Sequence, residues 1–134
     1  MKENNIHSLI QAWFDKAEKD LLSAKHESSF EDAVLETVCF HCQQSVEKYI
    51  KGYLIYLGII FPKTHEIGEL ITLSEQKDSD ISELKEEADK LTDYAVEIRY
   101  PDDYVPIKKS DAEEALKIAV NVKTYINSKV IHEA

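Results

Sequence analysis

Glycine and proline are scarce in this chain, whose 134 residues include three of each. Turns and irregular loops depend heavily on these two residue types, so the chain has little material for many short elements. No stretch alternates apolar and polar residues in the way that a half-buried strand requires. We therefore expect a few long helices joined by a few loops, and an all-α fold.

Long apolar runs and arginine are also scarce. No run reaches the ~18 apolar residues that a membrane-spanning helix needs, and the first five residues lack the apolar segment of a signal peptide. The single arginine is Arg99. The net charge of −10 disfavours general binding of nucleic acids, including RNA, because phosphate contacts need clustered cations. The two cysteines, Cys39 and Cys42, lie one turn apart on a predicted helix, where geometry disfavours a mutual disulfide. We expect a cytoplasmic protein without a membrane partner.

The chain is long enough for one domain with a hydrophobic core, predicted over residues 1–134. Apolar residues recur three and four apart, which is the spacing of one face of a helix. This spacing predicts an up-and-down bundle of four long helices and one short helix. The expected helices cover residues 6–26, 30–57, 65–75, 79–98 and 110–130.

Several residues are expected to mark the ends of these helices. Gly58 fits a C-terminal stop, and Thr64 fits an N-cap for the short helix. Two pairs resemble capping boxes, Ser29 with Asp32 and Ser110 with Glu113. Gly52 lies inside the second predicted helix, where glycine costs ~1 kcal/mol relative to alanine. We therefore expect another backbone to approach closely at this position.

The second predicted helix carries a row of polar residues beside its apolar arc. With about 3.6 residues per turn, His41, Gln44, Lys48 and Lys51 fall on one row. Such a border is either the edge of a binding site or the water-facing limit of an amphipathic helix. The sequence leaves both interpretations open.

Two further positions are candidates for binding an anion. Lys63 and His65 flank the predicted start of the short helix, where backbone N–H groups and the helix dipole favour negative charge. The alternative is that Thr64 is only a cap and His65 only packs. Arg99 can clamp a phosphate or carboxylate with two parallel hydrogen bonds, or pair with a nearby aspartate.

Cysteines and tyrosines in the second predicted helix have less specific interpretations. Cys39, His41 and Cys42 include zinc-type ligands, but no second ligand pair stands at a recognisable spacing, so buried thiols are favoured. Tyr49, Tyr53 and Tyr56 form a cluster for which packing is favoured over base stacking. We expect no metal site and no cofactor.

Blocks spread along the chain together resemble the HEPN family, named for a nucleotide-binding domain of higher eukaryotes and prokaryotes. They occur in the family's order from Trp13 to the last helix, and the glutamine-pair block with the Thr-His block is the most specific part. The blocks are Trp13 with Ala17-Glu18-Lys19-Asp20-Leu21, Phe40-His41-Cys42-Gln43-Gln44-Ser45-Val46-Glu47-Lys48 with Lys51, Phe61-Pro62-Lys63-Thr64-His65-Glu66-Ile67, and Arg99-Tyr100-Pro101-Asp102.

The resemblance implies a bundle of about five helices that usually forms a homodimer. It also implies a small prokaryotic protein, often paired with a minimal nucleotidyltransferase in a toxin–antitoxin-like arrangement. Some HEPN branches are metal-independent ribonucleases with an arginine followed, after four to six residues, by a histidine. Positions 104–106 after Arg99 hold Tyr104, Val105 and Pro106 instead. The ribonuclease motif is therefore incomplete.

We therefore predict a non-catalytic HEPN-type module that forms a homodimer and binds a nucleotide or assists a partner nucleotidyltransferase. The alternatives are a ribonuclease with a non-standard histidine and a purely structural helical dimer. No catalytic residue is assigned. The expected ligand-binding residues are His41, Gln44, Lys48, Lys51, Lys63, His65 and Arg99.

Overall fold

The computed structural model describes residues 2–95 and 106–130, and all its regular elements in these ranges are helices. Long helices form α1 (Lys2–Ser28), α2 (Leu35–Leu57) and α5 (Lys109–Lys129). Shorter elements lie between α2 and α5 along the chain. They are α3 (Ile67–Ser74), the 3-10 helix η1 (Ser79–Leu84), α4 (Lys85–Asp89) and the 3-10 helix η2 (Thr92–Ala95). The predicted all-α class is confirmed.

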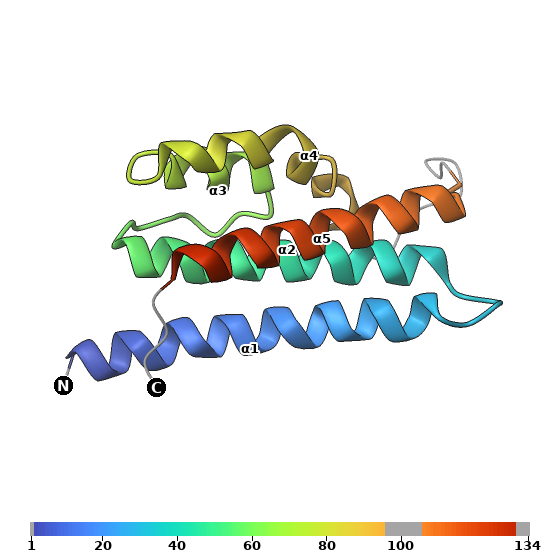
Figure 1. The fold of residues 1–134 in the computed structure, drawn as a ribbon, viewed down its shortest axis with the longest axis horizontal. Coiled ribbons are helices and arrows are strands. Elements are labelled where there is room, and N and C mark those ends of the chain that lie inside the picture. The colour runs from blue at the N-terminus through green and yellow to red at the C-terminus, as the bar shows by residue number, and fades with distance from the viewer. Residues whose placement is uncertain (1, 96–105, 131–134) are drawn as a thin grey trace.

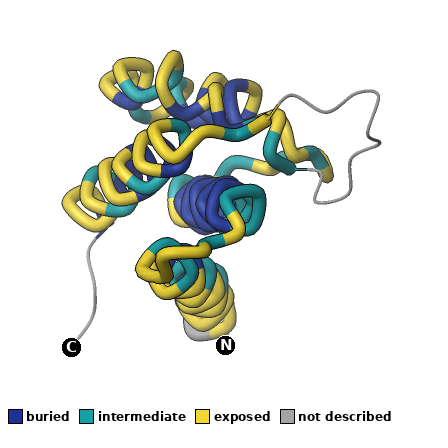
Figure 2. Tube along the Cα trace, turned by 90° about the vertical axis from the view of Figure 1, so that its right-hand side faces the viewer, coloured by how far each residue is buried: buried dark blue, intermediate teal, exposed yellow. Residues whose placement is uncertain are grey.

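Helix α2 lies at the centre of the bundle. Figure 1 shows α1 on one side of it, while α5 and the hairpin of α3 with η1 and α4 lie on the other side. The view along the bundle shows α2 almost entirely buried, whereas α1 and α5 expose their outer faces (Figure 2). Helices α2 and α5 run in the same direction, because the chain returns through the segment between them. The core surrounds α2, so buried polar side chains on this helix are expected to bond within the bundle. Among the described residues, the buried Ser45 hydroxyl is an exception, because it has no hydrogen-bond partner.

The end of α2 agrees with the sequence, but its start does not. Gly58 adopts a left-handed conformation with φ 76°, and its N–H donates to the Ile55 carbonyl at 3.0 Å. The helix begins at Leu35 rather than at residue 30, and the capping box predicted for Ser29 and Asp32 is wrong. The Ser29 hydroxyl instead donates to the His26 carbonyl at the end of α1, at 2.7 Å. A hydrogen bond to the preceding helix α1 thus takes the place of the cap that Ser29 was expected to provide for α2.

The fourth long helix predicted from residue 79 is broken into η1, α4 and η2. Its apolar stripe is still used, since Ile81, Ala88 and Leu91 are buried in the core. The break coincides with two polar side chains that turn towards α3. Asp89 accepts from the Gly68 N–H at 2.8 Å, and the Thr92 hydroxyl accepts from the Ile67 N–H at 3.1 Å. Side chains that accept hydrogen bonds from the backbone N–H groups of another helix favour short 3-10 turns over a continuous helix.

The N-terminal caps of α3 and α5 are shifted from their predicted positions. Thr64 accepts a hydrogen bond from the Glu66 N–H at 3.1 Å, but α3 begins only at Ile67, so Thr64 stabilises the preceding turn. Helix α5 begins at Lys109, where the Asp111 carboxylate accepts from the Lys108 N–H at 2.9 Å. The box predicted two residues later, with Ser110, is therefore wrong. An acidic residue in the first turn still supplies the cap.

Gly52 is a point of close contact between α2 and α1. A Cβ atom at this position would lie 2.7 Å from Cε1 of Phe14 and 3.1 Å from Cβ of Trp13. The close neighbours of Gly52 are therefore side chains of α1, and not the backbone that the sequence led us to expect.

Within the described residues, no helix is long and apolar enough to cross a membrane.

Candidate functional site

Asp20 of α1 binds a histidine and a lysine from the neighbouring face of α2. Its Oδ1 atom lies 2.9 Å from Nδ1 of His41, and its Oδ2 atom accepts a hydrogen bond from Nζ of Lys48. All three side chains are partly exposed. A single carboxylate therefore holds one end of the predicted polar row in place.

Glu47 has the same role further along α2, but in a more buried setting. Its side chain is 6% exposed, and it accepts hydrogen bonds from Lys51 Nζ at 2.9 Å and Gln43 Nε2 at 3.0 Å. Nδ1 of His65, in the loop before α3, lies 2.8 Å from Oε1 of the same carboxylate. Burial alone would raise the pKa of Glu47, but the hydrogen bonds from Lys51, Gln43 and His65 lower it below its usual range. Glu47 is therefore a carboxylate at neutral pH.

The two glutamines belong to the Glu47 group. Gln44 Nε2 donates to Gln43 Oε1 at 2.6 Å, and Gln43 Nε2 also lies 3.5 Å from the His65 carbonyl oxygen. The contacts across α1, α2 and the α2–α3 loop thus form two groups, one around Asp20 and one around Glu47, and we call the two groups together the polar cluster. The polar cluster consists of Asp20, His41, Gln43, Gln44, Glu47, Lys48, Lys51 and His65.

Both histidines of the polar cluster are oriented in the same way. Each faces its carboxylate through Nδ1, and an ionised carboxylate only accepts, so Nδ1 carries the proton. The Nε2 atom of each ring is then left for another partner. His65 presents it in a side chain that is 68% exposed, whereas His41 is more enclosed. A carboxylate-anchored imidazole of this kind can donate to an anion when protonated, or accept a proton when neutral.

The structure brings together most of the residues that the sequence predicted as ligands. Lys63 is exposed and lies two positions before His65 in the same loop, outside the polar cluster. Arg99 lies outside the described residues. The predicted residues found in the polar cluster are His41, Gln44, Lys48, Lys51 and His65.

Three members of the polar cluster were missed by sequence reasoning, namely Asp20, Gln43 and Glu47. The spacing of Gln43, Glu47 and Lys51 at four-residue intervals was the available signal, because such neighbours meet on a helix surface. No such spacing marks Asp20, which lies 28 positions from Lys48 and stood only in the first block of the family resemblance. The polar row predicted from the sequence contained no carboxylate, and the tertiary structure shows that Asp20 and Glu47 bind its members.

Cys39 and Cys42 are free and fully buried. Burial raises the pKa of Cys39 to about 11 and the pKa of Cys42 to about 12. Both therefore remain neutral thiols at neutral pH, although the thiolate is the form that attacks substrates and binds metals. Their position agrees with the predicted packing role.

The tyrosines of α2 bind carboxylates within the fold. The Tyr49 hydroxyl donates to Glu18 at 2.6 Å, and the Tyr53 hydroxyl donates to Asp78 at 2.7 Å. Tyr56 stacks on Tyr53 with ring centroids 6.1 Å apart. Tyr49 and Tyr53 are buried, which confirms the packing interpretation for these two residues.

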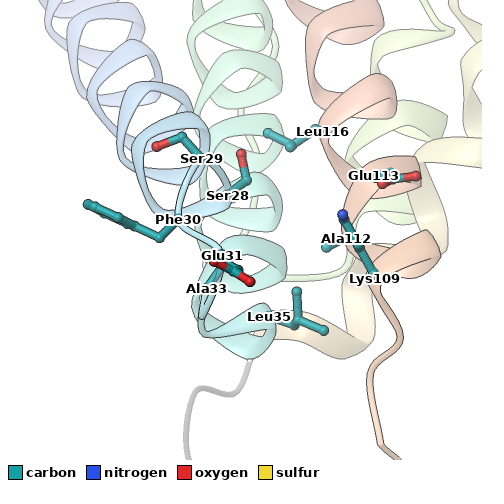
Figure 3. A pocket seen from close by; sticks show the side chains of 10 residues that line it. All are labelled: Ser28, Ser29, Phe30, Glu31, Ala33, Leu35, Lys109, Ala112, Glu113 and Leu116. Atoms are coloured by element: carbon teal, nitrogen blue, oxygen red, sulfur yellow. The ribbon is translucent and has the colours of Figure 1, made fainter.

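A hollow of about 500 Å³ lies near the end of α1, beside the first turns of α2 and α5 (Figure 3). It contains no member of the polar cluster, and Phe30 at its edge is 60% exposed. Two glutamates and one lysine contribute the charges of its lining. The lining residues are Ser28, Ser29, Phe30, Glu31, Ala33, Leu35, Lys109, Ala112, Glu113 and Leu116.

A scan against protein-family models matches the HEPN domain over residues 10–129. The chain belongs to the HEPN family. The match spans α1 to α5 and includes every residue of the polar cluster. The resemblance inferred from the sequence blocks is thus confirmed.

Several known proteins are similar to this chain in sequence, and two of them have solved structures with a similar fold. A protein of Methanocaldococcus jannaschii named "Putative toxin MJ1304" is 34% identical, and the alignment covers 80% of this chain and 78% of that protein. The crystal structure of ST0689, an archaeal HEPN homologue, is 28% identical with a TM-score of 0.70, covering 90% of this chain and 96% of that chain. The crystal structure of TT1696 from Thermus thermophilus is 26% identical with a TM-score of 0.76, covering 90% and 98% of the two chains.

Proposed function

We propose that this HEPN protein is a non-catalytic binding module that holds the phosphate groups of a nucleotide at the polar cluster. The main support is the anchoring of His41 and His65 by carboxylates, which leaves one ring nitrogen of each histidine for a ligand. Phosphate oxygens are acceptors, and a protonated imidazole or a lysine ammonium donates to them. The nucleotide is either free or presented by a partner protein.

The local charge of the polar cluster differs from that of the whole chain. The carboxylates Asp20 and Glu47 are balanced by Lys48 and Lys51, so the cluster is neutral when both histidines are neutral. Protonation of the histidines makes it positive, and the exposed Lys63 adds a further charge nearby in the sequence. An anion therefore meets less repulsion at the polar cluster than the net charge of −10 alone would suggest.

A partner role is proposed on the basis of the relatives. The toxin name of the Methanocaldococcus jannaschii relative supports a place for this chain in a toxin–antitoxin-like pair. We propose a homodimer whose polar cluster receives the nucleotide of a minimal nucleotidyltransferase. Such a partner would bring the phosphate groups to the exposed ring of His65.

Thermal denaturation with ATP tests the binding function. At about ten times its dissociation constant, ATP should raise Tm by about 5 °C, because linkage then contributes ~1.4 kcal/mol. Lys63→Ala and His65→Ala should remove most of this rise, since both residues are exposed and neither substitution opens the core. Lys117→Ala, which removes an exposed lysine from α5, is the matched control and should keep the rise. If ATP leaves the Tm of the wild type unchanged, the function proposed here is wrong.

A ribonuclease is the second candidate, and the Asp20–His41 pair is the observation that favours it. An aspartate that orients a histidine through Nδ1 is the arrangement that general acid–base catalysis uses. If this pair acts on RNA, purified protein should cleave RNA in the presence of a metal chelator. His41→Ala should abolish the cleavage. RNA that stays intact at high protein concentration would rule this candidate out.

A further inference from the structure

Trp13 lines a groove on an exposed side of α1. The groove has a volume of about 190 Å³, and its other lining residues are Leu9, Ala12 and Lys16 from the same helix. Leu9 is 49% exposed, and Trp13 is half-buried. An accessible indole beside an apolar floor and a lysine is a surface on which a planar aromatic ligand can stack.

The groove adjoins the polar cluster through one shared contact. Nζ of Lys51 lies 5.8 Å from the centroid of the Trp13 ring, and the same nitrogen donates to Glu47. Glu47 in turn binds His65, so contacts run without interruption from the indole to the exposed imidazole. The missing side chain at Gly52 lets the Cβ atom of Trp13 sit against α2, which holds the indole close to Lys51.

We propose that the Trp13 groove is the base-binding subsite of the nucleotide whose phosphates lie at the polar cluster. This inference rests on the function proposed above and adds the base-recognising residue. Base–aromatic stacking does not depend on which base is present, because every base has a π-face. Lys16 in the groove complements a ligand that carries negative charge.

The larger hollow where α5 begins is a poorer site for the same ligand. Its lining contributes Glu31 and Glu113 against a single lysine, Lys109, so its local charge repels phosphate. None of its lining residues belongs to the polar cluster. The Trp13 groove combines an accessible indole with a contact from Lys51, a cation anchored by Glu47.

Fluorescence of the wild-type protein tests this proposal directly, because Trp13 is the only tryptophan in the chain. ATP and inorganic triphosphate are titrated separately, with N-acetyltryptophanamide as the correction for light absorbed by the ligand. We expect ATP to quench the emission saturably, and inorganic triphosphate to raise Tm without quenching. The dissociation constant of ATP is then obtained from the quenching and from the rise in Tm. Equal values would show that the base and the phosphates of ATP bind at one site.

Substitutions of Trp13 give the second measurement. Trp13→Ala should raise the dissociation constant of ATP about tenfold and leave that of inorganic triphosphate unchanged, whereas Trp13→Phe should retain most of the ATP affinity. ATP binding that neither quenches Trp13 nor weakens in Trp13→Ala overturns the base-binding subsite and leaves the phosphate-binding function standing. Failure of both ligands to raise Tm overturns the phosphate-binding function itself, and the subsite with it.

Discussion

Replacing Glu47 with alanine is expected to lower the free energy of unfolding by about 3–5 kcal/mol at neutral pH. The substitution leaves the Lys51 ammonium, whose side chain is 10% exposed, without its counter-charge. The Gln43 amide and the His65 ring also lose the carboxylate to which they bond. Losing one partner of a buried pair costs more than the pair contributes, because the remaining charge stays desolvated. Urea denaturation of the variant and the wild type measures the difference.

The double variant Glu47→Ala/Lys51→Met separates this cause from a simple loss of packing. Removing both charges should recover much of the lost stability, since no unpaired Lys51 ammonium then remains in the fold. Glu87→Ala is the matched control, because it breaks an exposed ion pair with Lys90 and should change stability little. A Glu47→Ala variant as stable as Glu87→Ala would show that Lys51 reaches water and that the cluster is not buried in solution.

Asp78→Ala is expected to lower the free energy of unfolding by about 2–4 kcal/mol. One carboxylate oxygen of Asp78 accepts from the Tyr53 hydroxyl at 2.7 Å and from the Tyr125 hydroxyl at 2.8 Å. These bonds tie the turn after α3 to both α2 and α5. Tyr53 is 2% exposed, so its hydroxyl would be left without this partner inside the fold. Urea denaturation at pH 7 again measures the effect.

The pH dependence of Asp78→Ala provides a test of its cause. Burial alone would raise the pKa of Asp78, but the hydrogen bonds from Tyr53 and Tyr125 lower it below its ordinary value of 3.8. A lowered folded-state pKa adds stability above the unfolded-state value, and this stability is lost as the pH falls through the folded-state pKa. The difference between wild type and Asp78→Ala should therefore be full at pH 7 and shrink below pH 3.8. A constant difference would mean that the carboxylate charge is not involved.

The polar cluster connects stability with the proposed function. Asp20 and Glu47 neutralise the lysines that the sequence had marked as ligands, so a phosphate must compete with a carboxylate for them. Within the described residues, no carboxylate pairs with Lys63 or with Nε2 of His65. This is why variants at these two positions are better probes of binding than variants at Lys48 or Lys51, which would also disturb the fold.

The helices were largely predictable, because burial of an apolar face leaves a period in the sequence that needs no knowledge of the fold. The stop at Gly58 was also predictable, since glycine adopts the left-handed conformation without steric cost. The starts of α2, α3 and α5 were misplaced, because Ser, Thr and Asp side chains had several backbone partners within reach. The broken fourth helix followed from contacts of Asp89 and Thr92 with α3, which lie 21 and 25 residues away in the chain.

The order of amino acids by itself determined that this is a helical HEPN protein with a polar row on its central helix. Local spacing and short blocks of residues carry that information. Only the tertiary structure decided that Asp20 and Glu47 hold the row, that Trp13 lies against Lys51, and that each of the two histidines keeps one ring nitrogen away from its carboxylate. Most of these contacts join separate helices and a loop. Their distances depend on how the helices pack, which no spacing along one helix records.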